Sequence, residues 1–197
     1  MRGRTKWLVN ILAVTSLFLL VACGPTPNKK SESLDWPIED FTYINQDEEE
    51  FGLSDLKGQV WIADFIFTNC TTVCLPMSTN MSKLQKRLKE EGLDVQLVSF
   101  SVDPEVDDPQ TLKKYGEEYE ADMKSWTFLT GYDQEEIERF AKENFKTIVQ
   151  KPSDSDQVTH GTLFYLVDAS GKIVKYYDGV KPDLDEIVSD VKDLQNE

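Results

Sequence analysis

The stretch that decides the fold runs from residue 59 to residue 74 and reads QVWIADFIFTNCTTVC. Its first half is mostly apolar and rich in β-branched and aromatic residues, which is typical of a central strand. Two cysteines follow at once. Pro76 then stands where a first helical turn tolerates proline, and apolar side chains recur at helical spacing until Gly92. The stretch predicts a strand, a cysteine loop and an amphipathic helix.

Strands and helices alternate along the rest of the chain. The same patterns predict strands at 95–102, 126–129, 163–167 and 173–177, and helices at 108–119, at 134–145 and after Pro182. Alternation indicates a buried sheet with parallel pairs, and the closing hairpin makes that sheet mixed. This order matches an α/β, thioredoxin-like fold, a central mixed β-sheet flanked by helices, with the cysteines where such sheets place their chemistry.

The amino terminus predicts export. Arg2, Arg4 and Lys6 precede a nearly uncharged apolar run, which is typical of a secretory signal and too short for a comfortable membrane-spanning helix. The run ends in Leu20-Val21-Ala22-Cys23, which resembles a bacterial lipobox. We therefore expect cleavage before Cys23 and a lipid on Cys23. An ordinary cleaved signal and an uncleaved anchor are the alternatives.

These signals divide the chain into three expected parts. Residues 1–22 are a signal peptide ending in the lipobox, and residues 23–33 are a lipidated, solvated tether with prolines and lysines. Residues 34–197 are long enough for one domain with a real core. We expect a monomer held by lipid on the outer face of the cell membrane.

The charge balance limits the partners. The chain has Lys+Arg 21 and Asp+Glu 36, and the signal removes three bases and no acids, which leaves 18 − 36 = −18. Such a surface repels nucleic acid and anionic lipid headgroups, so we expect no nucleic-acid partner and attribute membrane attachment to the lipid. A protein partner that docks by electrostatics needs a basic patch. Solubility alone is the simpler explanation of the charge.

Cys70 and Cys74 are the cysteines that remain once Cys23 carries lipid. Their spacing lets both sulfurs converge on one point if Cys74 lies in the first helical turn, where the peptide dipoles favour a thiolate. A disulfide across so short a loop constrains the unfolded chain little, which favours exchangeable chemistry over a structural staple. The residues leave open a redox disulfide, a metal site and a structural disulfide.

His160 is the sole histidine of the chain. A lone histidine is more often structural. His160, however, immediately precedes the strand at 163–167, and in a thioredoxin-like fold that turn faces the cysteine loop. Two thiolates and an imidazole suit copper, with zinc possible, although no further cysteine or histidine is present to close a structural zinc site. We predict one copper ion, Cu(I) or Cu(II), between Cys70, Cys74 and His160.

Two acids are candidates for supporting the site. Asp64 interrupts the central strand, and a buried carboxylate there would have a raised pKa and could manage protons during thiol exchange, much as in thioredoxins; a solvent-facing or hydrogen-bonding acid is the alternative. Asp103 leaves the strand at 95–102 at the same sheet edge, where it is a supporting group, an oxygen ligand or a turn residue. We assign Met77 and Met81 to the core.

The chain resembles the Sco family, also written Sco/SenC, the assembly factors for the copper A centre of cytochrome c oxidase. The resemblance covers nearly the whole mature domain and rests on residues 65–70 with Cys74, 101–105, 126–131 and 158–160. Leu75 departs from it, because family members commonly have proline there. The resemblance implies that Cys70, Cys74 and His160 are copper ligands, and that the reduced dithiol is the form that binds.

The resemblance also implies two alternative functions. The first is a metallochaperone that delivers copper to the oxidase subunit with the copper A centre, which is not an enzyme. The second is a thiol-disulfide oxidoreductase that reduces the copper-ligand cysteines of that subunit through Cys70 and Cys74. Peroxide reduction is disfavoured, because the proline and threonine that precede a peroxiredoxin's reactive cysteine are missing and Phe67 holds the threonine position.

Overall fold

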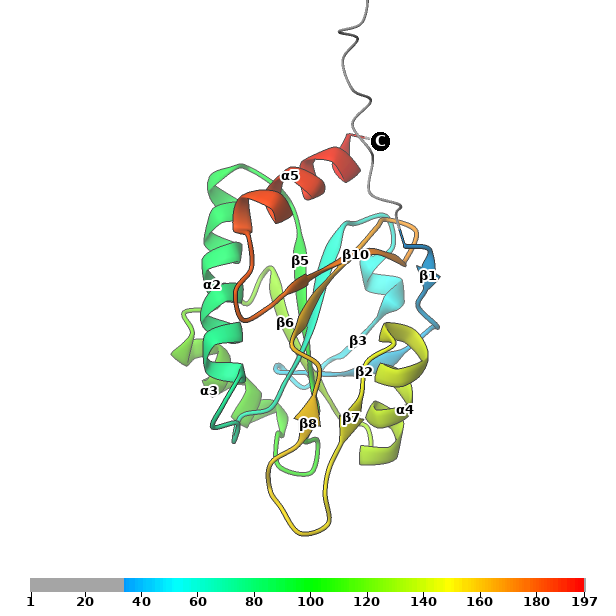
Figure 1. Ribbon diagram of the computed structural model, residues 1–197, viewed down its shortest axis with the longest axis vertical. Coiled ribbons are helices and arrows are strands. Elements are labelled where there is room, and N and C mark those ends of the chain that lie inside the picture. Colours follow the sequence, from blue (N-terminus) through cyan, green and yellow to red (C-terminus); the bar gives the residue numbers. More distant parts are fainter. Residues whose placement is uncertain (1–33, 197) are drawn as a thin grey trace, which may run out of the picture. The chain divides into compact units, whose positions relative to one another are not determined.

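The computed structural model describes residues 34–196, in which strands and helices alternate along the chain (Figure 1). The signal peptide, Cys23 and the tether, predicted for residues 1–33, lie outside the described residues, as does Glu197. Within residues 34–196, no helix combines the length and the apolar character needed to cross a bilayer.

The elements agree with the predicted order. The helices are α2 (Cys74–Glu90), α3 (Pro109–Glu118), α4 (Gln134–Phe145) and α5 (Leu184–Gln195), with a short 3-10 helix η2 (Leu53–Leu56). The strands are β1 (Trp36–Pro37), β2 (Thr42–Asn45), β3 (Glu50–Gly52), β4 (Trp61–Ile66), β5 (Gln96–Ser101), β6 (Trp126–Thr130), β7 (Val149–Gln150), β8 (Thr159–His160), β9 (Leu163–Val167) and β10 (Lys172–Asp178).

The main sheet is mixed, as predicted. Its strand order is β1-β10-β9-β4-β5-β6-β2-β3, in which β4, β5 and β6 run parallel and the other pairs run antiparallel. The strand from the deciding stretch, β4, lies between β9 and β5, and all six of its residues are buried. A strand covered on both faces reads as a continuous apolar run, which is why this segment was so recognisable.

Helices cover both faces of the sheet. Alternate residues of β4 enter two separate cores: Trp61, Ala63 and Phe65 pack on the side of α4, whereas Ile62 and Ile66 pack on the side of α2, α3 and α5. This division follows the two-residue period of a strand. The predicted core methionines of α2 are fully buried in the second cluster. The sheet therefore gives β4 a fixed carboxyl end, from which the cysteine loop emerges.

The first helix after β4 begins where the sequence placed it. Pro76 is expected in a first helical turn, and α2 begins at Cys74, which puts the proline in that turn. The backbone N–H groups of a first turn have no partner inside the helix, so a proline there removes none of the helical hydrogen bonds. The short strands β1, β2, β3, β7 and β8 were not predicted, because two to four residues carry too little periodicity to read from sequence.

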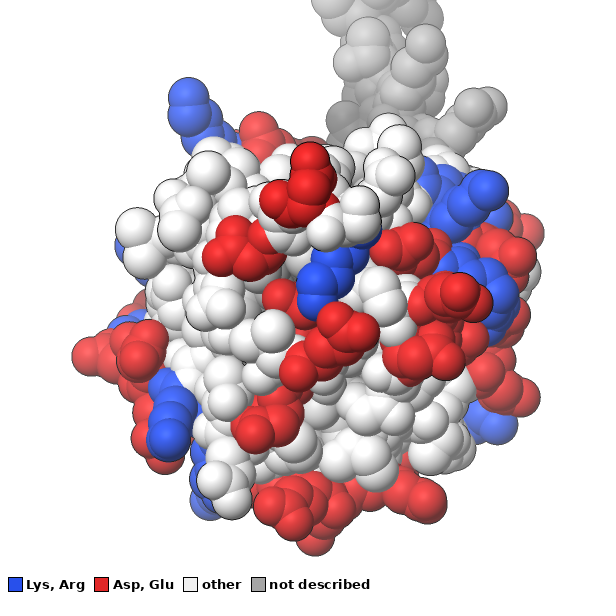
Figure 2. Space-filling view, turned by 90° about the horizontal axis from the view of Figure 1, so that it is seen from below, with Lys and Arg blue, Asp and Glu red and all other residues white. Residues whose placement is uncertain are grey.

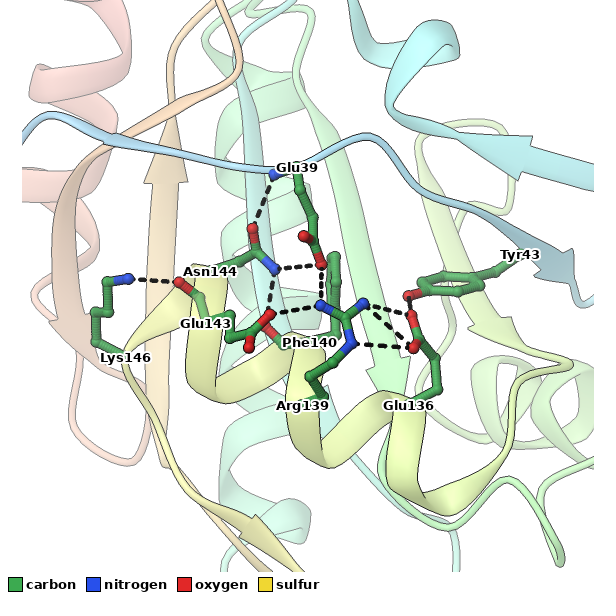
Figure 3. A network of polar contacts seen from close by, with 8 residues as sticks. All are labelled: Glu39, Tyr43, Glu136, Arg139, Phe140, Glu143, Asn144 and Lys146. Carbon is green, nitrogen blue, oxygen red and sulfur yellow. Dashed lines mark hydrogen bonds and ion pairs between the residues drawn. The ribbon is translucent and has the colours of Figure 1, made fainter.

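A polar cluster attaches α4 to the segment that leads into β2 (Figure 3). The Arg139 guanidinium contacts the carboxylates of Glu39, Glu136 and Glu143 at 2.5 to 3.0 Å. Asn144 supports the same attachment, since its Oδ1 accepts a hydrogen bond from the backbone N–H of Glu39 at 2.8 Å. We call these residues the Arg139 cluster.

Candidate metal centre

The cysteine loop, residues 67–74, continues from the carboxyl end of β4 into α2. The backbone N–H of Cys70 donates to the Phe67 carbonyl at 3.3 Å, which turns the chain back toward the helix. Cys74 is the first residue of α2, and its backbone N–H donates to the Cys70 sulfur at 3.3 Å. Cys74 is buried, Cys70 is partly exposed, and both are free thiols. The helix start thus presents one sulfur to solvent and places the other beneath it.

His160 reaches the sulfurs from a separate hairpin. β7 and β8 pair antiparallel, with His160 opposite Val149. The His160 Nε2 atom lies 3.2 Å from the Cys74 sulfur, and Nδ1 lies 2.8 Å from the Gly161 carbonyl oxygen. A carbonyl only accepts, so the Nδ1 proton belongs in that hydrogen bond, which directs the Nε2 lone pair at the sulfur. The ring also meets Phe67 edge to face, with centroids 5.7 Å apart.

The three donor atoms converge on one point. The two sulfurs and the imidazole nitrogen all lie within 4.8 Å of one another, and within residues 34–196 no other group of three or more histidines, cysteines and acids converges in this way. Two soft sulfurs with one borderline nitrogen are a donor set that copper prefers, whereas hard oxygen-seeking cations do not. The residues present therefore fit a copper ion, as the sequence predicted.

The two thiols differ in acidity. A hydrogen bond from Cys74 lowers the pKa of Cys70, and the backbone N–H groups of Thr72 and Cys74 act in the same direction. The pKa of Cys74 is raised, because its proton is engaged by Cys70 and its sulfur is buried. Of the two, Cys70 is therefore the more acidic thiol. A partly exposed thiolate is both a nucleophile and a metal ligand.

Asp64 is a buried acid beneath the site. Its side chain is fully buried, and its Oδ1 accepts a hydrogen bond of 2.6 Å from the Ser99 hydroxyl, which itself accepts from the Trp126 indole N–H. Its Oδ2 has no hydrogen-bond partner in the structure. Burial raises the pKa of Asp64 to about 7, and the hydrogen bond from Ser99 opposes the rise. Asp64 is thus a buried carboxyl with a raised pKa that has no hydrogen bond to either sulfur within residues 34–196.

Asp103 lies in the turn after β5 and is held by an ion pair. Its buried carboxylate accepts from the Lys151 ammonium group at 2.7 Å, its backbone N–H donates to the Ser101 hydroxyl, and its carbonyl accepts from Val106 and Asp107. Its carboxylate is not part of the convergent donor group. Through Lys151, Asp103 connects the β5–α3 loop to the end of β7.

Asp107 is a residue that the sequence analysis missed. Its buried carboxylate accepts from the Thr68 hydroxyl at 2.5 Å, from the Thr68 backbone N–H and from the Ser101 hydroxyl at 2.6 Å. Burial raises the pKa of this carboxyl, and the same three hydrogen bonds oppose the rise. Asp107 fixes the start of the cysteine loop. A single side chain in the loop after β5 carries no periodic signal, so the sequence did not reveal this contact.

Comparison with known proteins decides the family. The family described as SCO1/SenC matches residues 31–196. The chain belongs to the SCO1/SenC family. Among solved structures, a SCO1/SenC family lipoprotein from Bacillus anthracis is 51% identical with a TM-score of 0.82, covering 84% of this chain and 98% of its own. The predicted family and the predicted thioredoxin-like fold are thereby confirmed.

Two further family structures bear on the chemistry of the relatives. BsSco, described as a member of the Sco family of cytochrome c oxidase assembly proteins with a disulfide switch, is 52% identical with a TM-score of 0.78, covering 83% of this chain and 96% of its own. Yeast Sco1 with copper bound is 28% identical with a TM-score of 0.65, covering 81% of this chain and 89% of its own. Members of the SCO1/SenC family thus include a copper-bound protein and a protein with a disulfide switch.

Proposed function

We propose that this SCO1/SenC protein binds one copper ion and serves the assembly of the copper A centre of cytochrome c oxidase. The observation that carries the proposal is the convergence of the Cys70 and Cys74 sulfurs and the His160 Nε2 atom within 4.8 Å. The copper-bound yeast relative and the oxidase-assembly relative BsSco support it. Copper is here a cargo that the protein accepts and passes on.

The three residues have distinct parts in binding. Cys70 supplies the thiolate that forms more readily, because a hydrogen bond from Cys74 lowers its pKa. Cys74 must lose its proton when it binds, so copper binding releases protons and strengthens as pH rises. His160 supplies a neutral imidazole nitrogen whose orientation is fixed by the Gly161 carbonyl. A Cys70–Cys74 disulfide removes both thiolates, so the redox state decides whether copper binds.

The proposal includes the location and the partner. We infer that the mature chain begins at lipidated Cys23, that residues 23–33 are its tether, and that residues 34–197 work outside the cytoplasmic membrane; the lipobox and the lipoprotein relative support this. The partner is the oxidase subunit that receives the copper. Figure 2 views the end of the domain that carries the β7–β8 hairpin, where acidic side chains outnumber basic ones. Charge complementarity favours a basic docking surface on that partner.

A second candidate function follows from the exposed Cys70 thiolate and from the disulfide switch of BsSco. In this role the Cys70 thiolate attacks a disulfide of the oxidase subunit and forms a mixed disulfide. Cys74 then loses its proton and displaces the subunit's sulfur. The subunit gains two electrons and its two thiols, and this chain keeps a Cys70–Cys74 disulfide.

His160 separates the two functions, because copper retention uses the imidazole and dithiol reduction does not. In cells that carry His160→Ala, copper delivery predicts oxidase deficiency that added copper rescues. A matched Cys70→Ser strain should lack oxidase under both functions, but a small added thiol should rescue it only if reduction is the role. Oxidase activity and spectra of membranes measure both. Normal oxidase in the His160→Ala strain would replace copper delivery with dithiol reduction.

A further inference from the structure

The hairpin that carries His160 stands apart from the main sheet. β7 and β8 form a separate two-stranded sheet with two residue pairs, Val149 with His160 and Gln150 with Thr159. Val149 and Val158 bury their side chains in the core, which holds the inner side of the hairpin. The backbone ladder of the main sheet does not reach it. Core packing holds the inner side of the hairpin, and side-chain contacts with the cysteine loop set the position of the imidazole relative to the sulfurs on its other side.

Gln157 makes such contacts from the connection between β7 and β8. Its Nε2 donates to the Asn69 carbonyl at 3.0 Å, and its Oε1 accepts from the backbone N–H of Thr71 at 3.4 Å and from the Thr71 hydroxyl at 3.3 Å. Asn69 and Thr71 are the residues on either side of Cys70. One side-chain amide, which is both donor and acceptor, thus holds the main chain before and after this cysteine.

We propose that Gln157 is a positioning residue that fixes the His160 hairpin against the cysteine loop and so keeps the imidazole on the Cys74 sulfur. Within residues 34–196, the other hydrogen bond between the hairpin and this loop joins Cys74 to His160 itself. Loss of the Gln157 amide therefore removes every hydrogen bond from the hairpin to this loop except that of His160 itself, and leaves the Phe67 ring contact beside it. The inference rests on the proposed copper site, since it concerns how that donor is held.

The copper test is a double-mutant cycle between Gln157→Ala and His160→Ala in reduced protein, with Cu(II) as the probe. Gln157→Ala should weaken Cu(II) about 10-fold, the lower range found when groups that orient metal ligands are removed. In the His160→Ala background the same change should have no further effect, because Gln157 acts through the imidazole. Gln150→Ala is the matched control. Gln150 is an exposed glutamine of β7 whose side chain makes no hydrogen bond to any residue of the described range 34–196, and its removal should leave the affinity unchanged.

A second readout needs no metal. His160 is the sole histidine, so its ring protons are unambiguous in the NMR spectrum of the reduced, metal-free protein. The edge-to-face contact with Phe67 shifts these resonances away from the values of a solvated histidine. Gln157→Ala should move them toward the solvated values, and Gln150→Ala should not. Thermal unfolding of each variant checks the fold. If Gln157→Ala is unfolded, the test is repeated with Gln157→Glu. This variant keeps the side-chain length and the oxygen acceptor, but it loses the N–H donor to Asn69.

The outcomes separate the two proposals. If the unmutated reduced protein binds no copper, the proposed function fails, while the His160 resonances still decide the role of Gln157. Unchanged resonances together with unchanged Cu(II) affinity in Gln157→Ala would overturn the inference. Equal weakening with and without His160 would also overturn it, because Gln157 would then act on the sulfurs alone.

Discussion

Two groups of polar side chains in this protein invite comparison, the Arg139 cluster and the metal centre. Both bring together anionic or electron-donating groups, but they differ in the source of the positive charge. In the Arg139 cluster, exposed carboxylates surround a guanidinium that the chain itself supplies (Figure 3). At the metal centre, two sulfurs and an imidazole converge, and within residues 34–196 no lysine or arginine hydrogen-bonds to either sulfur. The first cluster already contains a cation of its own, whereas the second is arranged to receive one.

The clusters also differ in what surrounds their acids. Burial raises the pKa of Asp64 beneath the metal centre, whereas hydrogen bonds from Arg139 lower the pKa of Glu136 on the surface. A raised carboxyl pKa means that the surroundings disfavour the negative carboxylate, and a lowered pKa means that they stabilise it. The number of polar contacts therefore does not distinguish a metal site from a surface ion-pair cluster. The two are distinguished by the softness of the donor atoms, by their burial and by whether the chain supplies a cation of its own.

The largest expected effect is on copper binding. Cys74→Ser replaces a soft sulfur ligand by a hydroxyl and should weaken copper by more than about 100-fold, since even groups that only support ligands change metal affinity by about 10- to 100-fold. Glu143→Gln in the Arg139 cluster is the control and should leave copper affinity unchanged. Competition with a chelator of known affinity measures both. Strong copper binding by Cys74→Ser, or loss of copper binding in Glu143→Gln, would contradict the assignment of copper binding to the metal centre alone.

The next effect concerns stability and pH. Asp64 has a pKa near 7 in the folded protein and about 4 when unfolded, so the folded state holds the proton more tightly. Its contribution is fully present below pH 4 and is lost as the pH rises through 7, by roughly 4 kcal/mol in total. Urea unfolding between pH 4 and 8 should show this fall in unmutated protein and not in Asp64→Asn. Equal slopes in the two proteins would mean that Asp64 is not a buried, protonated acid.

The sequence predicted the parts of the site whose signals are local. The buried strand β4 read as an apolar run, and Cys70 and Cys74 follow it directly, so their place at a helix start could be predicted from neighbouring residues. His160 needed more, because its approach depends on the whole fold. Only the expectation of a thioredoxin-like order placed it opposite the cysteines.

Contacts between distant loops could not be predicted. Asp107 binds Thr68 across 39 positions, and Gln157 binds Thr71 across 86. Neither has a periodic or compositional signal, because a single side chain in a loop carries no period. The hairpin strand β8 was not predicted for the same reason, because it is only two residues long. Such residues are visible only once the sheet has brought the loop ends together.

The smallest effect is expected in the Arg139 cluster. Arg139→Met should lower the urea midpoint slightly at neutral pH, because Glu136 loses the partner that lowers its pKa. A lowered carboxyl pKa stabilises above the unfolded value and is lost as the pH falls through the folded one, so the difference should vanish in acid. It should also shrink in high salt, since these groups are exposed. A loss that persists in acid and in high salt would mean that Arg139 acts by packing.

The most direct test of the central claim is a copper titration of the protein in its two redox states, after removal of all metal. The dithiol form should bind one copper ion per chain and develop a sulfur-to-copper charge-transfer band with Cu(II). The form with a Cys70–Cys74 disulfide should bind none at this site, because its sulfurs are no longer thiolates. Equal binding by the two forms would contradict the assignment of Cys70 and Cys74 as the copper ligands.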